Sequence, residues 1–272
     1  MPMHQRTLSF LLLLSVFVLP VAAQVRPAII AHRGGAKEST ENTIEAFQRA
    51  TQIGALGSET DIRLTKDGEV VIYHDDNVGR VEGLSFAQKG PLVADVTYQE
   101  LKAKTLKPVG DDKGGRQVPT FKAVLDQVTS GLLNVELKRC PRFDELVEKT
   151  IVILKNHPAL DRVVLEAPDL VTAQKLRDGL GSKLKLHINP GYDSSVPYDV
   201  AVKKVIEFKP HSLSISYKKL SWEIVDLAHK AGVEVWVWTV DDPGIAQAVA
   251  LLGADAIKTD KPTMLLELFR KK

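Results

Sequence analysis

The chain has 272 residues, and 44% of them are apolar, which is enough for one sizeable hydrophobic core. Its 36 Lys and Arg residues nearly balance 34 Asp and Glu residues, so the composition excludes a nucleic-acid binder that relies on a broad basic surface. This balance still permits a small local cluster of cations around a phosphate, and a small-molecule ligand is therefore expected rather than a nucleic acid.

Residues 1–23 have the layout of a secretory signal peptide. Arg6 precedes an apolar run over residues 8–19, and Pro20 and small residues up to Ala23 follow it. The run is shorter than the roughly 20 residues that a membrane-spanning helix needs. We therefore expect cleavage after Ala23 and export to the periplasm or outside the cell, with no stable membrane insertion afterwards. An uncleaved anchor is the alternative.

From residue 28 onward, short β-branched runs alternate with amphipathic helical patterns. Strands are expected over residues 28–32, 57–64, 132–138, 162–166, 184–188, 212–216, 234–239 and 256–259. Helical patterns include residues 43–53, 143–155, 171–178, 221–231 and 243–252, with Gly54, Gly179, Gly232 and Gly253 just after four of them. Strands separated by helices predict parallel βαβ units. Eight such strands predict a (β/α)₈ TIM barrel made of residues 24–272, and a doubly wound open sheet is the alternative.

One segment interrupts this alternation. Residues 70–74 form a further strand-like run, and an Asp67-Gly68 pair before it is a strong signal of a two-residue hairpin turn. That turn would place Asp61 opposite His74. Residues 77–117, which are rich in Gly, Lys and Asp, then look like an insertion over the top of the barrel rather than a second core, with a short helical patch near residues 97–104.

Carboxylates gather on two of the expected strands. Glu59 and Asp61 stand two residues apart, hence on one face, where they would repel each other unless a positive charge lay between them. A hard divalent cation with oxygen ligands is the simplest solution, and a pair of solvated acids is the alternative. On a second strand, Glu136 and Lys138 also share a face. They are either a metal ligand and a phosphate contact or a buried ion pair.

The end of the first strand carries His32 and Arg33, at the edge where barrel enzymes build their active sites. The Arg33 guanidinium offers a fork of donors that matches phosphate oxygens. Asn42 precedes the first helix and is a candidate N-cap. Of the two tryptophans on a late strand, Trp236 is expected in the core and Trp238 in a wall of the substrate pocket. The single cysteine, Cys140, is interpreted as structural or incidental.

Taken in order, these residues resemble the glycerophosphodiester phosphodiesterase family. The matching segments are His32-Arg33-Gly34, Glu41-Asn42-Thr43, Glu59-Thr60-Asp61, Thr65-Lys66-Asp67-Gly68, His74-Asp75, Asn134-Val135-Glu136-Leu137-Lys138, Trp238-Thr239-Val240 and Thr259-Asp260. The resemblance implies a barrel that cleaves glycerophosphodiesters to glycerol 3-phosphate and an alcohol. It also implies one divalent ion, Ca²⁺ or Mg²⁺, on Glu59, Asp61 and Glu136, with His32 and His74 as the acid–base pair and Arg33 and Lys138 on the phosphate.

Three segments depart from the family pattern. Residues 77–83 replace a Thr-rich stretch, Asp241 replaces an Asn, and the run His187-Ile188-Asn189-Pro190 matches no family motif. These departures are expected at the rim of the pocket, where they would change substrate choice rather than reaction type. The alternatives to a glycerophosphodiesterase are a lysophospholipase D or a cyclising lyase acting on lysolipids, and a non-catalytic exported binding protein.

Overall fold

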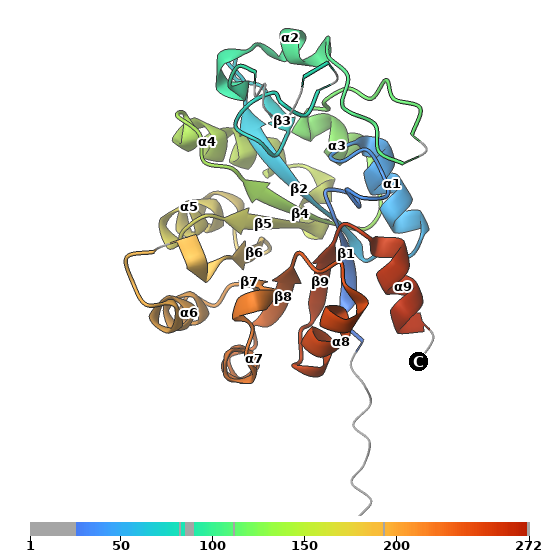
Figure 1. Ribbon diagram of the computed structural model, residues 1–272. Helices are drawn as coiled ribbons and strands as arrows, with labels where there is room; N and C mark the ends of the chain where they lie inside the picture. Colours follow the sequence, from blue (N-terminus) through green and yellow to red (C-terminus); the bar gives the residue numbers. More distant parts are fainter. Residues whose placement is uncertain (1–25, 82, 85–89, 111, 193, 271–272) are drawn as a thin grey trace, which may run out of the picture.

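A computed structural model describes residues 26–270 apart from 82, 85–89, 111 and 193, so the expected signal peptide lies outside the described residues. Within them, parallel strands form a sheet in the order β1-β9-β8-β7-β6-β5-β4-β2, and pairing of β1 with β2 closes it. Helices surround the closed sheet (Figure 1). The TIM barrel is therefore confirmed, and the open sheet is excluded.

The observed elements follow the predicted alternation. The barrel strands are β1 (Ala28–His32), β2 (Gly57–Leu64), β4 (Leu132–Leu137), β5 (Val163–Ala167), β6 (Lys185–Ile188), β7 (Ser212–Ser216), β8 (Glu234–Trp238) and β9 (Ala256–Thr259). The helices that follow them are α1 (Ile44–Gln52), α3 (Phe121–Gln127), α4 (Phe143–Leu154), α5 (Leu170–Leu180), α6 (Tyr198–Glu207), α7 (Trp222–Lys230), α8 (Pro243–Leu251) and α9 (Pro262–Arg270). Each predicted barrel strand therefore agrees with the observed one to within a residue at either end.

One helix end differs from its prediction. Gly179 lies inside α5, and the C-cap is Gly181, whose φ of +82° is the left-handed conformation that glycine tolerates. Gly179 serves packing instead, because a Cβ at this position would come within 2.7 Å of Ile151 on α4. Gly179 therefore marks a close contact between two helices and not a helix end.

Alternation along the strands separates two parts of the core. Outward residues such as Ile62, Leu165 and Val235 pack against the helices in the main hydrophobic cluster. Ile30 and Trp236 belong to a separate cluster that fills the base of the barrel, and Trp236 is almost fully buried, as predicted. Polar inward residues are left at the C-terminal ends of the strands, where a site can form.

The hairpin after β2 has a different register from the predicted one. β3 (Val70–Ile72) pairs antiparallel with β2, but the Asp61 carbonyl accepts a 2.9 Å hydrogen bond from the backbone of Tyr73, not His74. The loop has three residues instead of two, because Gly68 adopts a φ of +81° at its third position. His74 therefore lies one residue beyond the pairing position that the two-residue turn predicted.

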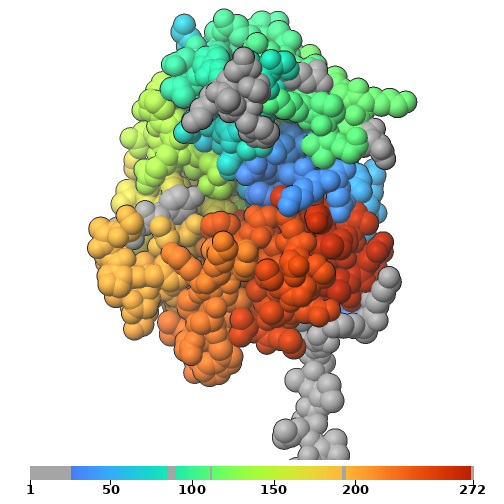
Figure 2. Space-filling model, viewed as in Figure 1, coloured from blue at the N-terminus to red at the C-terminus, as the bar shows by residue number. Residues whose placement is uncertain are grey.

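Between β3 and α3, in the segment expected as an insertion, the described residues include a 3₁₀ turn, η1 (Val93–Asp95), and the short helix α2 (Tyr98–Lys102). The insertion covers one end of the molecule, next to the blue surface of the N-terminal residues (Figure 2). It has a hydrophobic cluster of its own, which includes Tyr73, Val78 and Leu101. Its polar composition did not predict this cluster. No helix in the described ranges is long and apolar enough to cross a bilayer.

Candidate active site

The C-terminal ends of the barrel strands surround a cavity of about 330 Å³. Its lining consists of His32, Arg33, Glu59, His74, Glu136, Lys138, Glu166, Asn189, Gly191, Trp238, Thr239 and Lys258. These include every residue predicted for the site except Asp61, which is fully buried next to two of them. Side chains from distant parts of the sequence therefore meet at one place, as the chemistry requires.

Three carboxylates meet at one side of the cavity. Glu59, Asp61 and Glu136 each offer an oxygen atom, and these atoms lie within 4.8 Å of one another. Burial and the neighbouring Asp61 raise the pKa of Glu59 to about 7. Burial opposes ionisation of Asp61 as well, but Lys138, His74 and Arg33 outweigh it and lower the pKa of that carboxyl. Such a cluster of oxygen donors, two of them desolvated, has the chemistry of a site for a hard divalent cation.

Lys138 lines the cavity beside the carboxylates. Its Nζ is 2.8 Å from Glu136 Oε1 and 3.0 Å from Asp61 Oδ1, so the ion pair considered for this residue is present. Burial opposes the charged form, but Asp61 and Glu136 raise the pKa of Lys138 above its usual value. Lys138 also lines the cavity, and a lysine held permanently charged there can contact an anionic ligand. The ion pair and the phosphate contact are therefore compatible.

The His32 imidazole is fixed by a carboxylate from the last strand. Its Nδ1 lies 2.6 Å from Oδ1 of Asp260, and its Nε2 is 3.8 Å from Oε2 of Glu59. Burial disfavours the imidazolium, but Glu59 and the Asp260 hydrogen bond outweigh it and raise the pKa of His32. With Nδ1 occupied, Nε2 is the atom available for proton exchange in the cavity.

His74 has a matching arrangement. Its Nδ1 lies 2.7 Å from Oδ1 of Asp75, and Arg63 Nε donates a 2.9 Å hydrogen bond to its backbone carbonyl. Burial opposes ionisation of Asp75, but His74 and Arg80 outweigh it and lower the pKa of this carboxyl. Each histidine is therefore oriented by an aspartate that engages Nδ1, so Nε2 is the nitrogen left for proton exchange.

Arg33 is held in the tight turn after β1. Its backbone adopts a φ of +53°, and its N–H donates to Glu59 Oε2 at 3.1 Å. Its guanidinium lies 3.7 Å from Asp61 and 3.4 Å from Glu41. The next residue, Gly34, has a φ of +83°, and a Cβ there would come within 2.6 Å of the Ala46 side chain. The glycine thus lets the turn pack directly on α1 and fixes the position of Arg33.

Asn42 has a different role from the predicted N-cap. The cap of α1 is Thr43, whose hydroxyl accepts from the Ala46 N–H at 3.2 Å. Asn42 instead donates from Nδ2 to Asp61 Oδ2 at 3.3 Å and accepts from the Thr60 hydroxyl at 2.8 Å. Asn42 therefore positions a carboxylate of the cluster. The Glu41-Asn42-Thr43 motif was the sequence signal that could have suggested this role.

Residues from two of the segments that depart from the family pattern contact Asp75 and Asp260, the aspartates that orient the histidines. Arg80, from residues 77–83, binds Asp75 through its Nε at 2.8 Å. Asp241 accepts hydrogen bonds from the Asp260 backbone at 2.8 Å and from Lys37 at 2.6 Å. The departures were expected at the rim of the pocket. In the structure, Arg80 and Asp241 contact the aspartates that bind His74 and His32.

Sequence reasoning missed a buried ion pair in the cavity wall, where Glu166 is the register partner of Glu136 on the neighbouring strand. Lys258 Nζ lies 2.7 Å from Oε2 of Glu166, and both side chains are about 3% exposed. His187, from the unmatched run, lies beside them with its Nδ1 2.8 Å from the Ser212 hydroxyl, and burial holds its pKa well below the usual value. Glu166 and Lys258 are 92 residues apart, so no local pattern pairs them.

A parallel barrel with its polar cavity at the C-terminal strand ends defines a TIM-barrel enzyme. Residues 32–264 match the model of the Glycerophosphoryl diester phosphodiesterase family. The chain therefore belongs to this family and is a phosphoric diester hydrolase.

Individual relatives agree with this assignment. A glycerophosphodiester phosphodiesterase of Caldanaerobacter subterraneus is 32% identical over 256 residues, which cover 91% of this chain and 99% of the relative. A putative glycerophosphoryl diester phosphodiesterase of Silicibacter pomeroyi has the same fold, with a TM-score of 0.82 at 22% identity over 92% of this chain and 95% of that one. An Oleispira antarctica phosphodiesterase, solved with the product sn-glycerol-3-phosphate, matches with a TM-score of 0.75 at 23% identity over 90% and 97% of the two chains.

Proposed function

We propose that the protein hydrolyses glycerophosphodiesters to glycerol 3-phosphate and an alcohol with the help of one divalent cation, Ca²⁺ or Mg²⁺. The observation that carries this proposal is the pair of carboxylate-oriented histidines, His32 and His74, lining the same cavity as the acidic cluster. The activity named for the Caldanaerobacter relative and the product bound to the Oleispira enzyme support the same substrate class.

Glu59, Asp61 and Glu136 would hold the cation. All three donors are carboxylate oxygens, which suit Ca²⁺ and Mg²⁺. Burial and the neighbouring Asp61 raise the pKa of Glu59, and a bound cation would stabilise its charged form. When bound, the cation supplies charge that polarises the phosphoryl group and stabilises the extra negative charge of the transition state.

The remaining residues bind the phosphate and move protons. Arg33 and Lys138 line the cavity as cations, and they would neutralise a diester that otherwise repels an attacking oxygen. His32 would remove a proton through Nε2, either from water or from the neighbouring glycerol hydroxyl, and His74 would protonate the departing alcohol oxygen. The reverse assignment of the two histidines is the alternative. Trp238 would form a wall beside the bound substrate.

Phosphorus NMR of a glycerophosphocholine reaction tests this proposal. With Mg²⁺ or Ca²⁺ present, we expect the diester signal to be replaced by that of glycerol 3-phosphate, because hydrolysis leaves a phosphomonoester. A cyclic phosphate as the final product would favour the lyase alternative. Absence of turnover on glycerophosphodiesters with either ion would favour the binding protein.

We also propose that the protein is exported and that its mature form begins at Gln24. The layout of residues 1–23 supports this proposal. N-terminal sequencing of the protein from fractionated cells is the test, with Gln24 expected at the N-terminus of the exported form. A full-length chain held in the membrane fraction would instead indicate an uncleaved anchor.

A further inference from the structure

The catalytic cavity contains an ion pair that has no part in the proposed acid–base chemistry. Glu166 and Lys258 both line the cavity, and Lys258 Nζ lies 2.7 Å from Glu166 Oε2. Glu166 is on β5 and Lys258 is on β9, and in the closed barrel β6, β7 and β8 separate these strands on one side and β1, β2 and β4 on the other. The pair therefore crosses the inside of the barrel between opposite walls.

The apolar base of the barrel begins beneath this ion pair. Residues two apart on a strand point to the same face, so Val164 and Ala256 share the inner face with the two charged residues that follow them. Both belong to the buried apolar cluster at the base of the barrel. On β1, the register partner of Lys258 is two residues before His32, so the catalytic imidazole lies one step nearer the open end. We call Glu166 and Lys258 the floor pair, because they close the bottom of the cavity.

Stability gives no reason for an ion pair at the bottom of the cavity. Both side chains of the floor pair are almost fully buried, so both charges have lost their hydration. The attraction between two buried charges barely offsets this loss, and apolar residues of similar volume are often at least as stable in their place. The described residues give the Lys258 ammonium one hydrogen-bond partner, Glu166, whereas an ammonium has three donors. Donors therefore remain for a ligand at the floor.

His187 places a further polar atom next to the floor pair. Its ring is fully buried, its Nδ1 lies 2.8 Å from the Ser212 hydroxyl, and its Nε2 lies 3.7 Å from Glu166 Oε2. Within the part of the chain that the structure describes, Nε2 has no hydrogen-bond partner. Buried polar atoms in proteins are nearly always hydrogen-bonded. The floor therefore favours a ligand group that both donates and accepts hydrogen bonds.

We propose that Glu166 and Lys258 determine specificity by binding the terminal hydroxyl of the substrate's glycerol, so that the enzyme selects diesters whose glycerol carries no acyl chain. A hydroxyl donates one hydrogen bond and accepts others, and the floor pair offers a carboxylate acceptor beside an ammonium donor. Glycerol is the part that all glycerophosphodiesters share, so it suits the closed end of the cavity, while the variable alcohol suits the open end. This proposal rests on the proposed function and narrows its substrate class.

An analogue that lacks only the terminal hydroxyl provides the first test. The phosphocholine ester at C1 of propane-1,2-diol keeps the choline leaving group and the hydroxyl next to the phosphoester. Without the terminal hydroxyl, the buried charges of the floor pair lose a hydrogen-bond partner. We therefore expect kcat/KM for choline release to be about 100-fold lower than with glycerophosphocholine. Similar kcat/KM values for the two substrates would overturn the proposal.

Replacing both members of the floor pair together assigns this preference to them. Glu166→Leu combined with Lys258→Met leaves no buried charge unpaired, so the double variant should fold, and thermal unfolding checks that it does. We expect it to lower kcat/KM for glycerophosphocholine by about 100-fold and to change that for the analogue little, so the preference for the terminal hydroxyl disappears. Asp226→Leu combined with Lys230→Met is the control, because it removes a pair on the outer helix α7. Equal losses on both substrates in the floor variant would indicate a structural role and contradict the proposal.

Product binding separates the floor pair from the chemistry. Titration calorimetry in Mg²⁺ compares glycerol 3-phosphate with propane-1,2-diol 1-phosphate, which lacks the terminal hydroxyl. If glycerophosphocholine is not hydrolysed, but the wild type binds glycerol 3-phosphate about tenfold or more tightly than the analogue and the double variant binds both alike, the proposed function fails and the role of the floor pair stands. If the wild type binds both compounds equally, or neither, the floor pair does not recognise the hydroxyl.

Discussion

Replacing His32 or His74 with alanine is expected to lower kcat on glycerophosphocholine by about 10²–10⁴-fold, the usual contribution of a positioned acid or base. Each imidazole lines the catalytic cavity and has one nitrogen engaged by an aspartate, Asp260 for His32 and Asp75 for His74. In each case Nε2 is the nitrogen left for proton transfer, and alanine removes it. KM should change little, because neither histidine is assigned to bind the phosphate.

A substrate with a better leaving group separates the two roles. A glycerophosphodiester of p-nitrophenol needs little protonation of the departing oxygen, so the variant that lacks the acid should recover most of its rate on it, and the variant that lacks the base should not. His229→Ala is the matched control, because His229 is partly exposed and lies outside the cavity. Near-normal turnover of glycerophosphocholine by His74→Ala would show that the acid–base assignment is wrong.

Removing divalent cations with EDTA is expected to abolish hydrolysis, and Mg²⁺ or Ca²⁺ should restore it. Without a cation, Glu59 and Asp61 are buried carboxylates side by side, and the pKa of Glu59 rises to about 7. Lys138 and Arg33 offset only part of the charge of the three carboxylates, so phosphate binding at this side of the cavity would be weakened by repulsion. The measurement is initial rate against free Mg²⁺ and free Ca²⁺ after dialysis against chelator. Full activity in EDTA would show that hydrolysis does not need a divalent cation.

Variants at Asp61 and Asn42 test whether the loss of activity in EDTA arises at the acidic cluster. Asp61→Asn should abolish activation by metal, while Asp126→Asn, on an exposed helix residue, should not change it. Asn42→Gly removes the hydrogen bond to Asp61 without backbone strain, because φ is +57° at this position, and we expect a 10- to 100-fold weaker apparent metal affinity. The rise in Tm on adding Mg²⁺ provides a readout that does not depend on turnover. It should shrink in Asp61→Asn and stay unchanged in Asp126→Asn.

Much of the barrel and of the site was predictable from local patterns. Period-two alternation put Glu59 and Asp61 on one face of β2 and Glu136 and Lys138 on one face of β4, and both pairs line or adjoin the cavity. The position of His32 at the end of β1 placed it at the catalytic edge by the general rule for parallel barrels. These features depend on residues within one strand, and the period of a strand is set by its backbone.

Contacts between elements were decided only by the folded chain. The hairpin register depended on whether Gly68 took the left-handed conformation in a third loop position, which an Asp-Gly pair alone does not specify. Asn42 could serve as a cap or a carboxylate partner, and the approach of α1 to β2 selected the second. The pairing of Glu166 with Lys258, from β5 and β9, needed the barrel to close.

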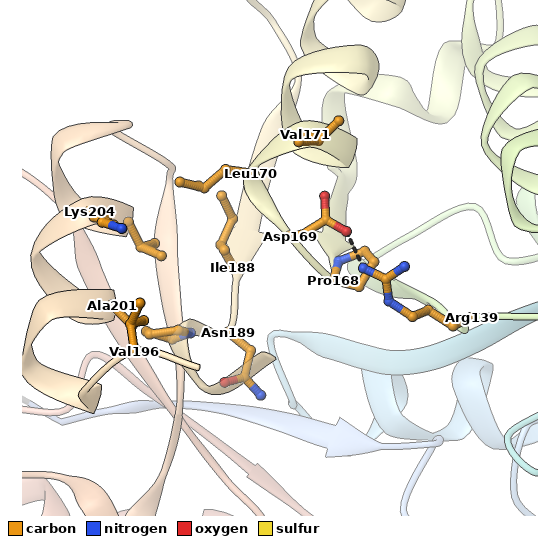
Figure 3. Close-up of a pocket in the computed structure, with 12 residues that line it drawn as sticks. Arg139, Pro168, Asp169, Leu170, Val171, Ile188, Asn189, Val196, Ala201 and Lys204 are labelled. Carbon is orange, nitrogen blue, oxygen red and sulfur yellow. Dashed lines mark hydrogen bonds and ion pairs between the residues drawn. The ribbon is translucent and has the colours of Figure 1, made fainter. Parts of the chain in front are cut away.

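A pocket of about 450 Å³ between α5 and α6 shows the same division (Figure 3). Pro168 belongs to the β5–α5 unit, whereas Ile188 and Val205 belong to the β6–α6 unit, and each is an ordinary apolar residue in its own stretch of sequence. The space that they line depends on the distance between the two helices. Amino-acid periodicity determines which face of an element is buried, because it acts through the element's own backbone. The shape of the space between elements depends on packing distances between residues far apart in the chain, and the tertiary structure alone sets those.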